Sequence, residues 1–586
     1  MISLAPVVLA AVMYTDAPGD AARFRVSEDG RTVCVNTARL GGESKEAVSK
    51  RAERYLELAK PVRPDDRRCP LMGWSSYKAF GADISKDRIL DQARIIATNG
   101  LKEAGYVYVN IDDGFMEGHD ARGAIIVDQA KFPGGLRETV DGIHALGLKA
   151  GIYSPAGFDE KFLWEGASAS VADGLYGHED SDCRFFFCDL GFDFLKVNGF
   201  FAARLRNADH KAIFMRIVEA VRRTGRDVRV NLCAQAFPGT WVDQVAESWR
   251  IGEDVLPSWW SAQKQIAESF YTSAYVSPGH YNDMDVMPIG RIRSENVFNN
   301  KSGFFSELEE QTYFGMCCMQ SSPLVVGRDL HKLPASTLKL MTNPYLLRMN
   351  QNEGVGVQGY IVRNDGAGAC VFVKDADERF GRSRYVAFYN GSEGEHEFRI
   401  SPRELDLGGK VEMFDLVGRA DCGLLTEDWS VTVPPHGAMF YRLDAEERLE
   451  QVIYEAEAAF LGDYQTIRNG WEAGTAYPVE GPYADKASGG MVVRYLGRRD
   501  TNDLTWKDVM IRKGGRRTLE IRGCSYRPYD IYVQVDDGPR MKLHFKQERE
   551  HYQTVSLEVE LTEGLHRIRL FNSYEWGPDI DKMEIR

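Results

Sequence analysis

Residues 69–353 alternate short apolar segments with amphipathic ones, and this alternation constrains the fold more than any other feature of the chain. The segments 106–111, 148–153 and 194–198 have the apolar composition of buried parallel strands, whereas 210–224 has helical spacing. About 280 residues of alternating strands and helices predict a parallel sheet, and this length is typical of a (β/α)8 barrel. A doubly wound sheet is the weaker alternative, because no glycine-rich phosphate-binding loop follows the first strand.

The remainder of the chain is expected to form three further parts. Residues 1–68 are an N-terminal appendage in which we find no chemistry-bearing pattern. In 354–445 the helical spacing disappears, and alternating strands predict an antiparallel β-sandwich domain. After a charged linker, 453–586 is a second β-rich block, for which we expect a jelly-roll β-sandwich. The predicted fold class is therefore α/β, with a (β/α)8 TIM barrel at 69–353 followed by two β-sandwiches.

Bulk properties argue against several classes of function. The formal net charge of −14 argues against a nucleic-acid partner, because phosphates need a basic surface. The ten cysteines form no CxxC pair and no metal-ligand spacing with histidines, so a zinc site is not expected. The apolar run 2–13 is too short to span a bilayer and lacks a basic segment before it, so we expect a strand there and no membrane insertion.

Polar residues follow the predicted strands at the end where (β/α)8 barrels carry their chemistry. Asp112 and Asp113 come directly after 106–111, and two adjacent carboxylates can accept hydrogen bonds from neighbouring hydroxyl groups of a sugar. A helix N-cap is the alternative for one of them. Lys196 lies on a predicted buried strand and needs a charged or hydroxyl partner, which favours a role in a site.

Other strand-end candidates are weaker when taken singly. Trp74 could offer an apolar platform to a sugar ring, although a lone tryptophan more often belongs to the core. Tyr153 ends the strand predicted at 148–153. Arg250 and Asp254 lie four residues apart, a spacing that a surface ion pair also explains.

Taken together, residues 69–445 resemble glycoside hydrolase family 27, the α-galactosidases and α-N-acetylgalactosaminidases. The resemblance rests on Pro70-Leu-Met-Gly-Trp74, the run 105–114, Phe132-Pro-Gly-Gly-Leu136, the run 144–153, Phe194-Leu-Lys-Val-Asn-Gly199, Trp249 and Arg250 with Asp254, the run 278–285 and Ser321-Ser-Pro-Leu324. It implies exo-hydrolysis of a terminal α-linked galactose with retention, by double displacement. It also implies a nucleophile at the position of Asn198, an acid/base at Asp254, and a sugar pocket lined by Trp74, Asp112, Asp113, Tyr153, Lys196 and Arg250.

The sequence departs from this family pattern at Asn198, where the family has an aspartate. An asparagine has neither the charge nor the leaving-group ability of a carboxylate, so it cannot sustain double displacement. Because the surrounding motif residues are intact, we favour an Asp→Asn substitution introduced to inactivate the enzyme; a naturally non-catalytic glycan-binding protein is the alternative. Asn-Gly pairs such as Asn198-Gly199 deamidate readily, which predicts trace activity in aged preparations.

A second departure concerns the 2-position of the sugar. Ala234 stands where the α-galactosidases have a glutamate and where the α-N-acetylgalactosaminidases have a small residue, so it favours a 2-acetamido sugar. Phe237 favours the opposite, because those relatives have another small residue there. α-N-Acetylgalactosaminidase is therefore the alternative within the same family. The family's cysteine pair beside the pocket is also absent.

Residues 453–586 resemble a carbohydrate-binding module of the family 6/35 type. The resemblance implies a structural calcium ion at Glu455, Glu457 and Asp581, since oxygen-rich ligands suit calcium; solvated surface charge is the alternative. The candidate sugar-stacking residues are Trp471, Tyr477, Tyr483 and Trp576, each of which could instead belong to the core.

Expectations for cofactor, partner and location follow from the same resemblance. No cofactor is expected for catalysis, because carboxylates carry the chemistry of retaining glycosidases. The expected partner is an oligo- or polysaccharide that contains α-galactosides. By resemblance to enzymes of glycan-degrading bacteria, we expect the protein to be secreted or periplasmic.

Overall fold

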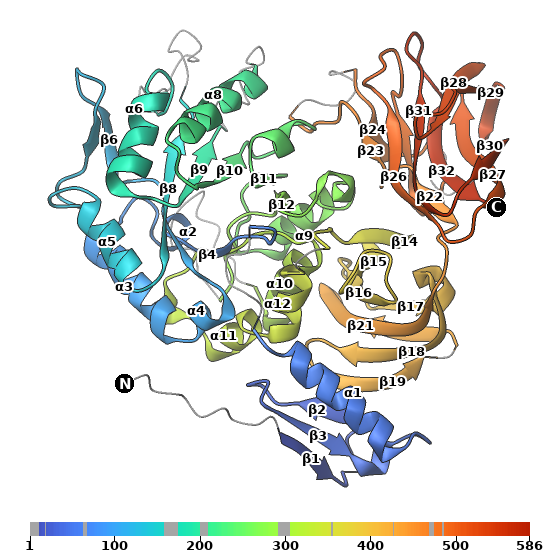
Figure 1. The fold of residues 1–586 in the computed structure, drawn as a ribbon, viewed down its shortest axis with the longest axis horizontal. Coiled ribbons are helices and arrows are strands. Elements are labelled where there is room, and N and C mark those ends of the chain that lie inside the picture. The colour runs from blue at the N-terminus through green and yellow to red at the C-terminus, as the bar shows by residue number, and fades with distance from the viewer. Residues whose placement is uncertain are drawn as a thin grey trace.

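The strands predicted within 69–353 pair in parallel in a single sheet (Figure 1). The computed structural model describes residues 11–17, 19–61, 67–157, 174–199, 209–290, 305–352, 355–425, 427–467, 474–482 and 486–586. Within them, the order across the sheet is β12 (Tyr281–Asp283), β11 (Ser248–Arg250), β10 (Arg229–Cys233), β9 (Phe194–Asn198), β8 (Lys149–Pro155), β5 (Tyr108–Ile111), β4 (Met72–Ser75) and β13 (Leu324–Val326). A parallel bridge from Met287, just beyond β12, to Val326 joins the two ends of this order. The sheet therefore curls into the predicted (β/α)8 barrel, and the fold class is confirmed.

Helices surround the barrel strands (Figure 1). In chain order they are α2 (Tyr77–Phe80), α3 (Lys86–Thr98), α4 (Leu101–Ala104), α5 (Arg137–Ala145), α6 (Glu179–Cys183), a π-helical segment (Arg184–Leu190), α8 (His210–Arg223), α9 (Trp259–Glu268), α10 (Glu307–Met319), α11 (Ala335–Met341) and α12 (Pro344–Asn350). Helical periodicity explains their packing: α3 begins at Ser85, whose side chain accepts the Arg88 N–H, and buries Ile89, Ala93 and Ile96 on one face.

Shorter elements complete the barrel region and its surroundings. β6 (Met116–His119) and β7 (Ile125–Val127) form a hairpin outside the main sheet. Short 3-10 turns lie along the whole chain at Thr37–Arg39, Val242–Gln244, Ser273–Tyr275, Leu330–Lys332, Pro402–Leu405 and Ser488–Gly490.

The N-terminal segment is continuous with the first β-sandwich. One sheet runs in the order β1 (Ala11–Thr15), β3 (Thr32–Asn36), β2 (Phe24–Val26), β19 (Ala420–Leu425), β18 (Leu407–Asp415), β21 (Gly437–Arg448), β16 (Ser383–Asn390), β15 (Ala369–Asp375) and β14 (Tyr360–Gly366), and a second sheet pairs β17 (His396–Ile400) with β20 (Trp429–Val433). Helix α1 (Lys45–Leu58) packs on the first sheet: Arg51 pairs with Asp421 at 3.1 Å, and the Tyr55 hydroxyl donates to Asp444 at 2.7 Å. Residues 11–58 thus share a core with the sandwich.

The C-terminal part contains two antiparallel sheets, as predicted for a second β-sandwich. One sheet has the order β24 (Tyr477–Glu480), β25 (Met491–Arg494), β32 (Asp579–Ile585), β27 (Gly515–Ser525) and β30 (Glu548–Leu561), with β22 (Ile453–Glu455) also paired to β32. The other has the order β23 (Phe460–Leu461), β26 (Leu504–Ile511), β31 (Gly564–Phe571), β28 (Tyr529–Val535) and β29 (Met541–Phe545). Two of the candidate sugar-stacking residues, Trp471 and Tyr483, lie outside the described residues.

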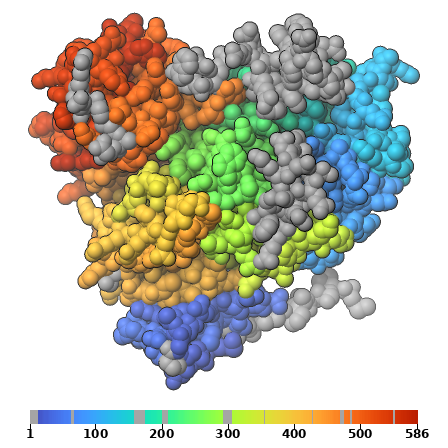
Figure 2. Space-filling model, turned by 180° about the vertical axis from the view of Figure 1, so that it is seen from behind, coloured from blue at the N-terminus to red at the C-terminus, as the bar shows by residue number. Residues whose placement is uncertain are grey.

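The C-terminal sandwich docks on the barrel at the loop that follows β10. The Phe237 N–H donates to Thr466 Oγ1 at 2.7 Å, and the Thr466 N–H donates to the Phe237 carbonyl at 3.0 Å. The fully buried Phe237 ring packs against Tyr275 and Tyr464, with ring centroids 4.8 and 5.5 Å away. Figure 2 shows the C-terminal sandwich, in orange and red, against both the barrel and the first sandwich.

Candidate active site

Strand β9 carries two of the predicted site residues to the carboxyl edge of the barrel sheet. Phe194, Leu195 and Val197 are buried, whereas the side chains of Lys196 and Asn198 are only partly buried. β9 lies between β8 and β10, so the residues that end these strands meet at one edge. This is the edge at which (β/α)8 barrels carry their active sites.

Lys196, which the sequence predicted to need a charged or hydroxyl partner, pairs with Asp112. The Lys196 ammonium lies 2.9 Å from Asp112 Oδ2, and the same oxygen accepts a hydrogen bond from Ser75 at 2.8 Å. Burial lowers the pKa of Lys196, but the charges of Asp112, Cys233 and Asp285 and the hydrogen bond to Asp112 together outweigh burial, and the net shift is upward. The ammonium is therefore charged at neutral pH and is held by a carboxylate that is itself 2% exposed.

The second carboxylate, Asp113, is half-buried beside Asp112. One of its oxygens accepts the Gly114 N–H at 2.7 Å. Burial and then the neighbouring Asp112 charge raise the pKa of Asp113, although the hydrogen bond from Gly114 and the charge of Lys196 oppose the shift. The structure thus places the two predicted acids together, with Asp112 committed to Lys196 and Asp113 nearer to solvent.

Asn198 contacts Tyr153 across strands β9 and β8. The Asn198 amide nitrogen lies 3.2 Å from the Tyr153 hydroxyl oxygen, and the Lys196 ammonium lies 5.4 Å from the centre of the Tyr153 ring. Burial, followed by the charges of Asp112 and Asp113, raises the pKa of Tyr153, so the hydroxyl stays protonated. Neither Asn198 nor Tyr153 therefore brings a negative charge to this part of the site.

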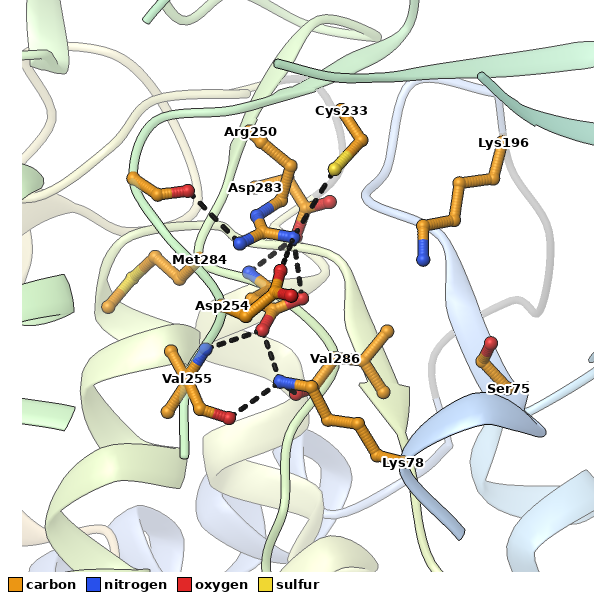
Figure 3. Close-up of polar contacts among 12 residues, drawn as sticks. Ser75, Lys78, Lys196, Cys233, Arg250, Asp254, Val255, Asp283, Met284 and Val286 are labelled. Carbon is orange, nitrogen blue, oxygen red and sulfur yellow. Dashed lines mark hydrogen bonds and ion pairs between the residues drawn. The ribbon is translucent and has the colours of Figure 1, made fainter. Parts of the chain in front are cut away.

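Asp254 lies just beyond β11, and nearby cations control its charge (Figure 3). Arg250 Nη1 lies 3.0 Å from Asp254 Oδ1 and 2.8 Å from Asp285 Oδ1. Burial raises the pKa of the Asp254 carboxyl, but Arg250, Lys78 and Lys196 outweigh burial and lower the pKa to about 2. Asp254 is the accessible carboxylate of this network, with 39% of its side chain exposed, whereas Arg250 is buried.

Sequence reasoning assigned no role to Lys78 or Asp285, which complete the network around Asp254. Lys78 binds the Asp285 carboxylate and donates to the carbonyls of Val255 and Val286 at 2.8 and 2.7 Å. The signal was present in the sequence, because Lys78 shortly follows β4 and Asp285 follows β12. Both lie at the strand ends from which the other candidates were chosen.

Trp74 and Ala234 are almost fully buried, as are Asp112 and Arg250. Trp74 is 1% exposed, and its indole N–H donates to the Arg328 carbonyl at 2.6 Å. With Lys196 and Arg250, it lines a cavity of about 30 Å³ inside the barrel. Ala234 is buried directly after β10, whereas Phe237 serves as the contact with the C-terminal sandwich. Docking therefore gives a second physical reason for a large side chain at Phe237.

The three carboxyls proposed from the sequence as calcium ligands lie near one another in the C-terminal sandwich. Ser488 links two of them: its hydroxyl donates to Glu455 at 2.6 Å, and its N–H donates to Asp581 at 2.8 Å. Burial raises the pKa of Glu455 to about 7 and also raises the pKa of Glu457. Among the described residues, Glu455 Oε2 and Glu457 Oε2 are buried without a hydrogen-bond partner. Arg522 already neutralises Asp581, so the two glutamates fit a cation better than Asp581 does.

The described residues set limits on a metal site and on a membrane-spanning helix. Within them, no group of three or more His, Cys, Asp or Glu side chains is arranged to hold a metal ion, so Glu455, Glu457 and Asp581 do not form a three-carboxylate site as their side chains stand. The helices among them include none that is long and apolar enough to cross a membrane.

Tyr477 and Trp576, the described stacking candidates, both pack against Tyr495, at ring-centroid distances of 5.8 and 5.5 Å.

Two family descriptions match the barrel and the first sandwich. Residues 69–352 match the family described as alpha galactosidase A, and residues 371–443 match the alpha galactosidase C-terminal beta sandwich domain. The match to the second description ends before the C-terminal sandwich.

Individual relatives cover the same part of the chain. Alpha-galactosidase A of Cellvibrio japonicus is 26% identical over 427 residues, which span 68% of this chain and 95% of the relative. The alpha-galactosidase of Oryza sativa subsp. japonica is 30% identical over 303 residues, which span 51% of this chain and 67% of the relative. The structure of the Saccharomyces cerevisiae α-galactosidase with raffinose has a TM-score of 0.54 at 22% identity, and the match covers 66% of this chain and 100% of that one. At that identity the structural match shows the shared fold.

Proposed function

The chain belongs to the α-galactosidase family, and from this premise we propose that its barrel binds a terminal α-linked galactose in a site whose nucleophile is replaced by Asn198. The observation that carries the proposal is the cluster at the carboxyl edge of the barrel. It contains the Lys196–Asp112 ion pair, the adjacent Asp113 and the Asn198–Tyr153 contact. Carboxylates, an ammonium and a phenol are the groups that hold a sugar through its hydroxyls.

We assign sugar binding to the charged residues of this cluster. Asp112 and Asp113 accept hydrogen bonds from the 4- and 6-hydroxyls, and Lys196 donates to a neighbouring hydroxyl. The ion pair between Lys196 and Asp112 supports this assignment, because it fixes both side chains before the sugar arrives. Tyr153 and Trp74 supply apolar surface next to the ring.

The chemistry of the family requires a carboxylate where Asn198 stands. In a retaining glycosidase a carboxylate forms a bond to the anomeric carbon while the bond to the leaving oxygen breaks, and a second carboxyl protonates that oxygen. The second carboxyl then takes a proton from the water that releases the sugar. We assign that acid/base role to Asp254. The neutral amide of Asn198 cannot take the nucleophile's part, so we propose that this chain binds its substrate without turning it over.

The 2-acetamido sugar is retained as a second candidate substrate because of one observation. Ala234 occupies a buried position directly after β10 and presents only a methyl group there. A small side chain at this position leaves space for an acetamido group, which a glutamate would fill. α-N-Acetylgalactosaminidase chemistry therefore remains the alternative within the family, and a non-catalytic glycan-binding protein is the alternative outside it.

The experiment that tests the proposal compares Asn198→Asp with the unmodified chain on an aryl α-galactoside and an aryl α-N-acetylgalactosaminide. We expect Asn198→Asp to hydrolyse one of the two and the unmodified chain to hydrolyse neither. Asn198→Ala is the matched control, because it changes the same side chain without adding a carboxylate. If Asn198→Asp is folded, binds galactose and hydrolyses neither sugar, the glycan-binding alternative replaces the enzyme.

We also propose roles for the C-terminal sandwich and for the whole protein. The sandwich is a carbohydrate-binding module that holds a structural calcium ion at Glu455 and Glu457, with Asp581 nearby; the buried, unpartnered glutamate oxygens support the ion. The partner is an oligo- or polysaccharide with terminal α-galactosyl groups. Because such polymers occur outside the cytoplasm, we propose that the protein is secreted or periplasmic.

A further inference from the structure

Lys78 reaches from one side of the barrel edge to the loop that carries Asp254 (Figure 3). It lies in α2, shortly after β4, and its ammonium donates to the carbonyl oxygens of Val255 and Val286 at 2.8 and 2.7 Å. It also binds the Asp285 carboxylate, and 17% of its side chain is exposed. One lysine thus connects α2 to the segments that follow β11 and β12.

Asp285 makes a second connection between the segments that follow β11 and β12. Its Oδ2 accepts the Val255 N–H at 2.7 Å, and its Oδ1 lies 2.8 Å from Arg250 Nη1. Both backbone polar groups of Val255 are therefore held, the carbonyl by Lys78 directly and the N–H through Asp285. Asp285 has a backbone φ of 84°, a conformation that a non-glycine residue keeps only where its surroundings enforce it. Asp254 immediately precedes Val255, so its position depends on these contacts.

We propose that Lys78 is a positioning residue for Asp254: it holds the segment that carries Asp254 and places a positive charge beside the Asp254 carboxyl. The inference rests on the proposed function, in which Asp254 is the acid/base. Lys78 touches neither the sugar nor the reacting atoms in this scheme. It acts through Asp285 and Val255, and through the positive charge that it places beside Asp254.

The charges that face Asp254 support this role. Burial raises the pKa of Asp254, and Arg250 and then Lys78 are the strongest of the groups that lower it to about 2. Lys196 in β9, Tyr77 in α2 and Cys233 in β10 also interact electrostatically with Asp254. Asp283 in β12 and Asp285 just after it face Arg250, the arginine that pairs with Asp254. Arg250 is held between two carboxylates and Lys196 is paired with Asp112, so Lys78 is the cation whose removal changes the charge beside Asp254 without breaking either of those pairs.

The consequence concerns the proton that Asp254 must donate to a leaving group. A carboxyl kept ionised is ready to act as a base, but it donates a proton only from the small fraction that is protonated. Without the Lys78 charge we expect the pKa of Asp254 to rise, by about one to two units for an opposite charge at this range. The alkaline limb of the pH profile of kcat/KM then moves to higher pH by the same amount.

The first test uses the Asn198→Asp background, in which turnover is expected. Lys78→Gln keeps a donor for the two carbonyls but removes the charge, and we expect its alkaline limb to move upward by about one to two pH units for a poor leaving group. For a dinitrophenyl galactoside, which needs no proton from Asp254, we expect little change in rate. Lys78→Arg should restore the original limb, and Lys86→Gln, on α3, controls for loss of a surface charge. An unmoved limb in Lys78→Gln overturns the proposal.

The second test needs no catalysis and so separates this inference from the proposed function. A neutral diazo ester esterifies protonated carboxyls, and Asp254 is accessible enough to be labelled. In the unmodified Asn198 chain at pH 5, peptide mass spectrometry should show several-fold faster labelling of Asp254 in Lys78→Gln than in Lys78→Arg. Equal labelling in two folded variants rejects the role of Lys78 even if Asn198→Asp is active. Faster labelling supports that role even if Asn198→Asp is inactive, in which case only the proposed function fails.

Discussion

Asn198 and Tyr153 are joined across neighbouring barrel strands by a hydrogen bond of 3.2 Å, in which the amide nitrogen donates to the phenol oxygen. An aspartate at position 198 would reverse this bond, because a carboxylate can only accept and the Tyr153 hydroxyl would then donate. The amide and the carboxylate have nearly the same shape. An aspartate at position 198 would therefore add a charge while filling the same volume of the site.

That filled volume predicts how the site responds to a small external nucleophile. Asn198→Gly opens a space in which azide can reach the anomeric carbon of a bound aryl α-galactoside with a good leaving group. We expect saturable formation of β-galactosyl azide in Asn198→Gly, at a rate about tenfold or more above the azide-free rate. The unmodified chain should show no rescue, because its carboxamide occupies the same space. NMR of the products detects the β-galactosyl azide and its anomeric configuration. Formation of the azide by the unmodified chain would count against the steric explanation.

Ala234→Glu tests which sugar the pocket accepts. A glutamate at this buried position fills the space next to the 2-position and leaves its carboxylate available to a 2-hydroxyl. We expect N-acetylgalactosamine binding to weaken by about tenfold or more, equivalent to about 1.4 kcal/mol, with a smaller effect on galactose. Calorimetric titration of both sugars into the unmodified chain and the variant measures the difference. A uniform loss for both sugars would place Ala234 outside the subsite for the 2-position.

Gly199 changes the expectation that the Asn-Gly pair deamidates readily. Deamidation at Asn198 begins with attack by the Gly199 backbone nitrogen on the side-chain amide, but the N–H of Gly199 donates to the Cys233 carbonyl at 2.8 Å. Gly199 is also buried, and a Cβ built on it would lie 2.4 Å from the Phe214 ring. We expect the folded protein to be stable to deamidation for weeks at neutral pH, whereas unfolded protein gains one mass unit at this peptide. Storage-dependent activity without unfolding would contradict this.

Glu455 and Glu457 predict a pH-dependent stability that calcium abolishes. The folded-state pKa of Glu455 is raised from 4.5 to about 7, so the stability that its protonated form contributes is present below pH 4.5 and is lost as pH rises toward 7. The loss from this group is at most about 3 kcal/mol in free energy of unfolding. Calcium should remove the loss by holding both glutamates ionised.

Thermal melts at pH 5 and pH 7.5, with calcium or with a chelator, measure this effect. We expect calcium to raise the melting temperature at pH 7.5 more than at pH 5, and Glu457→Gln to reduce the response. An unchanged melting temperature at pH 7.5 would argue that no ion binds there.

The fold was predictable from the sequence because its signals are local. Apolar strands such as 194–198 and helices such as α8 can be recognised from their composition and their hydrophobic period. Because (β/α)8 barrels carry their chemistry at the carboxyl ends of the strands, Asp112, Lys196 and Asp254 could then be chosen as candidates. What the sequence could not show is how distant segments meet. Nothing in the sequence indicated that Phe237 contacts the C-terminal sandwich.

The same limit explains why Lys78 was missed. Its partners lie 177 to 208 positions away in the chain, and no local pattern marks a lysine that crosses a barrel edge. The N-terminal strands β1 to β3 join the sheet of the first sandwich for a similar reason, because sheet pairing of that range depends on tertiary contacts rather than on sequence period.

The reciprocal hydrogen bonds between Phe237 and Thr466 hold the C-terminal sandwich, the proposed binding module, against the barrel. A binding module on a flexible tether sweeps a volume and acts through effective concentration. A module held against the barrel loop has one orientation relative to the barrel. A glycan that binds both the barrel site and the module must therefore span a fixed distance in a fixed direction. Under the proposed function, the protein therefore discriminates between polysaccharides by the spacing of their branches and the stiffness of their chains.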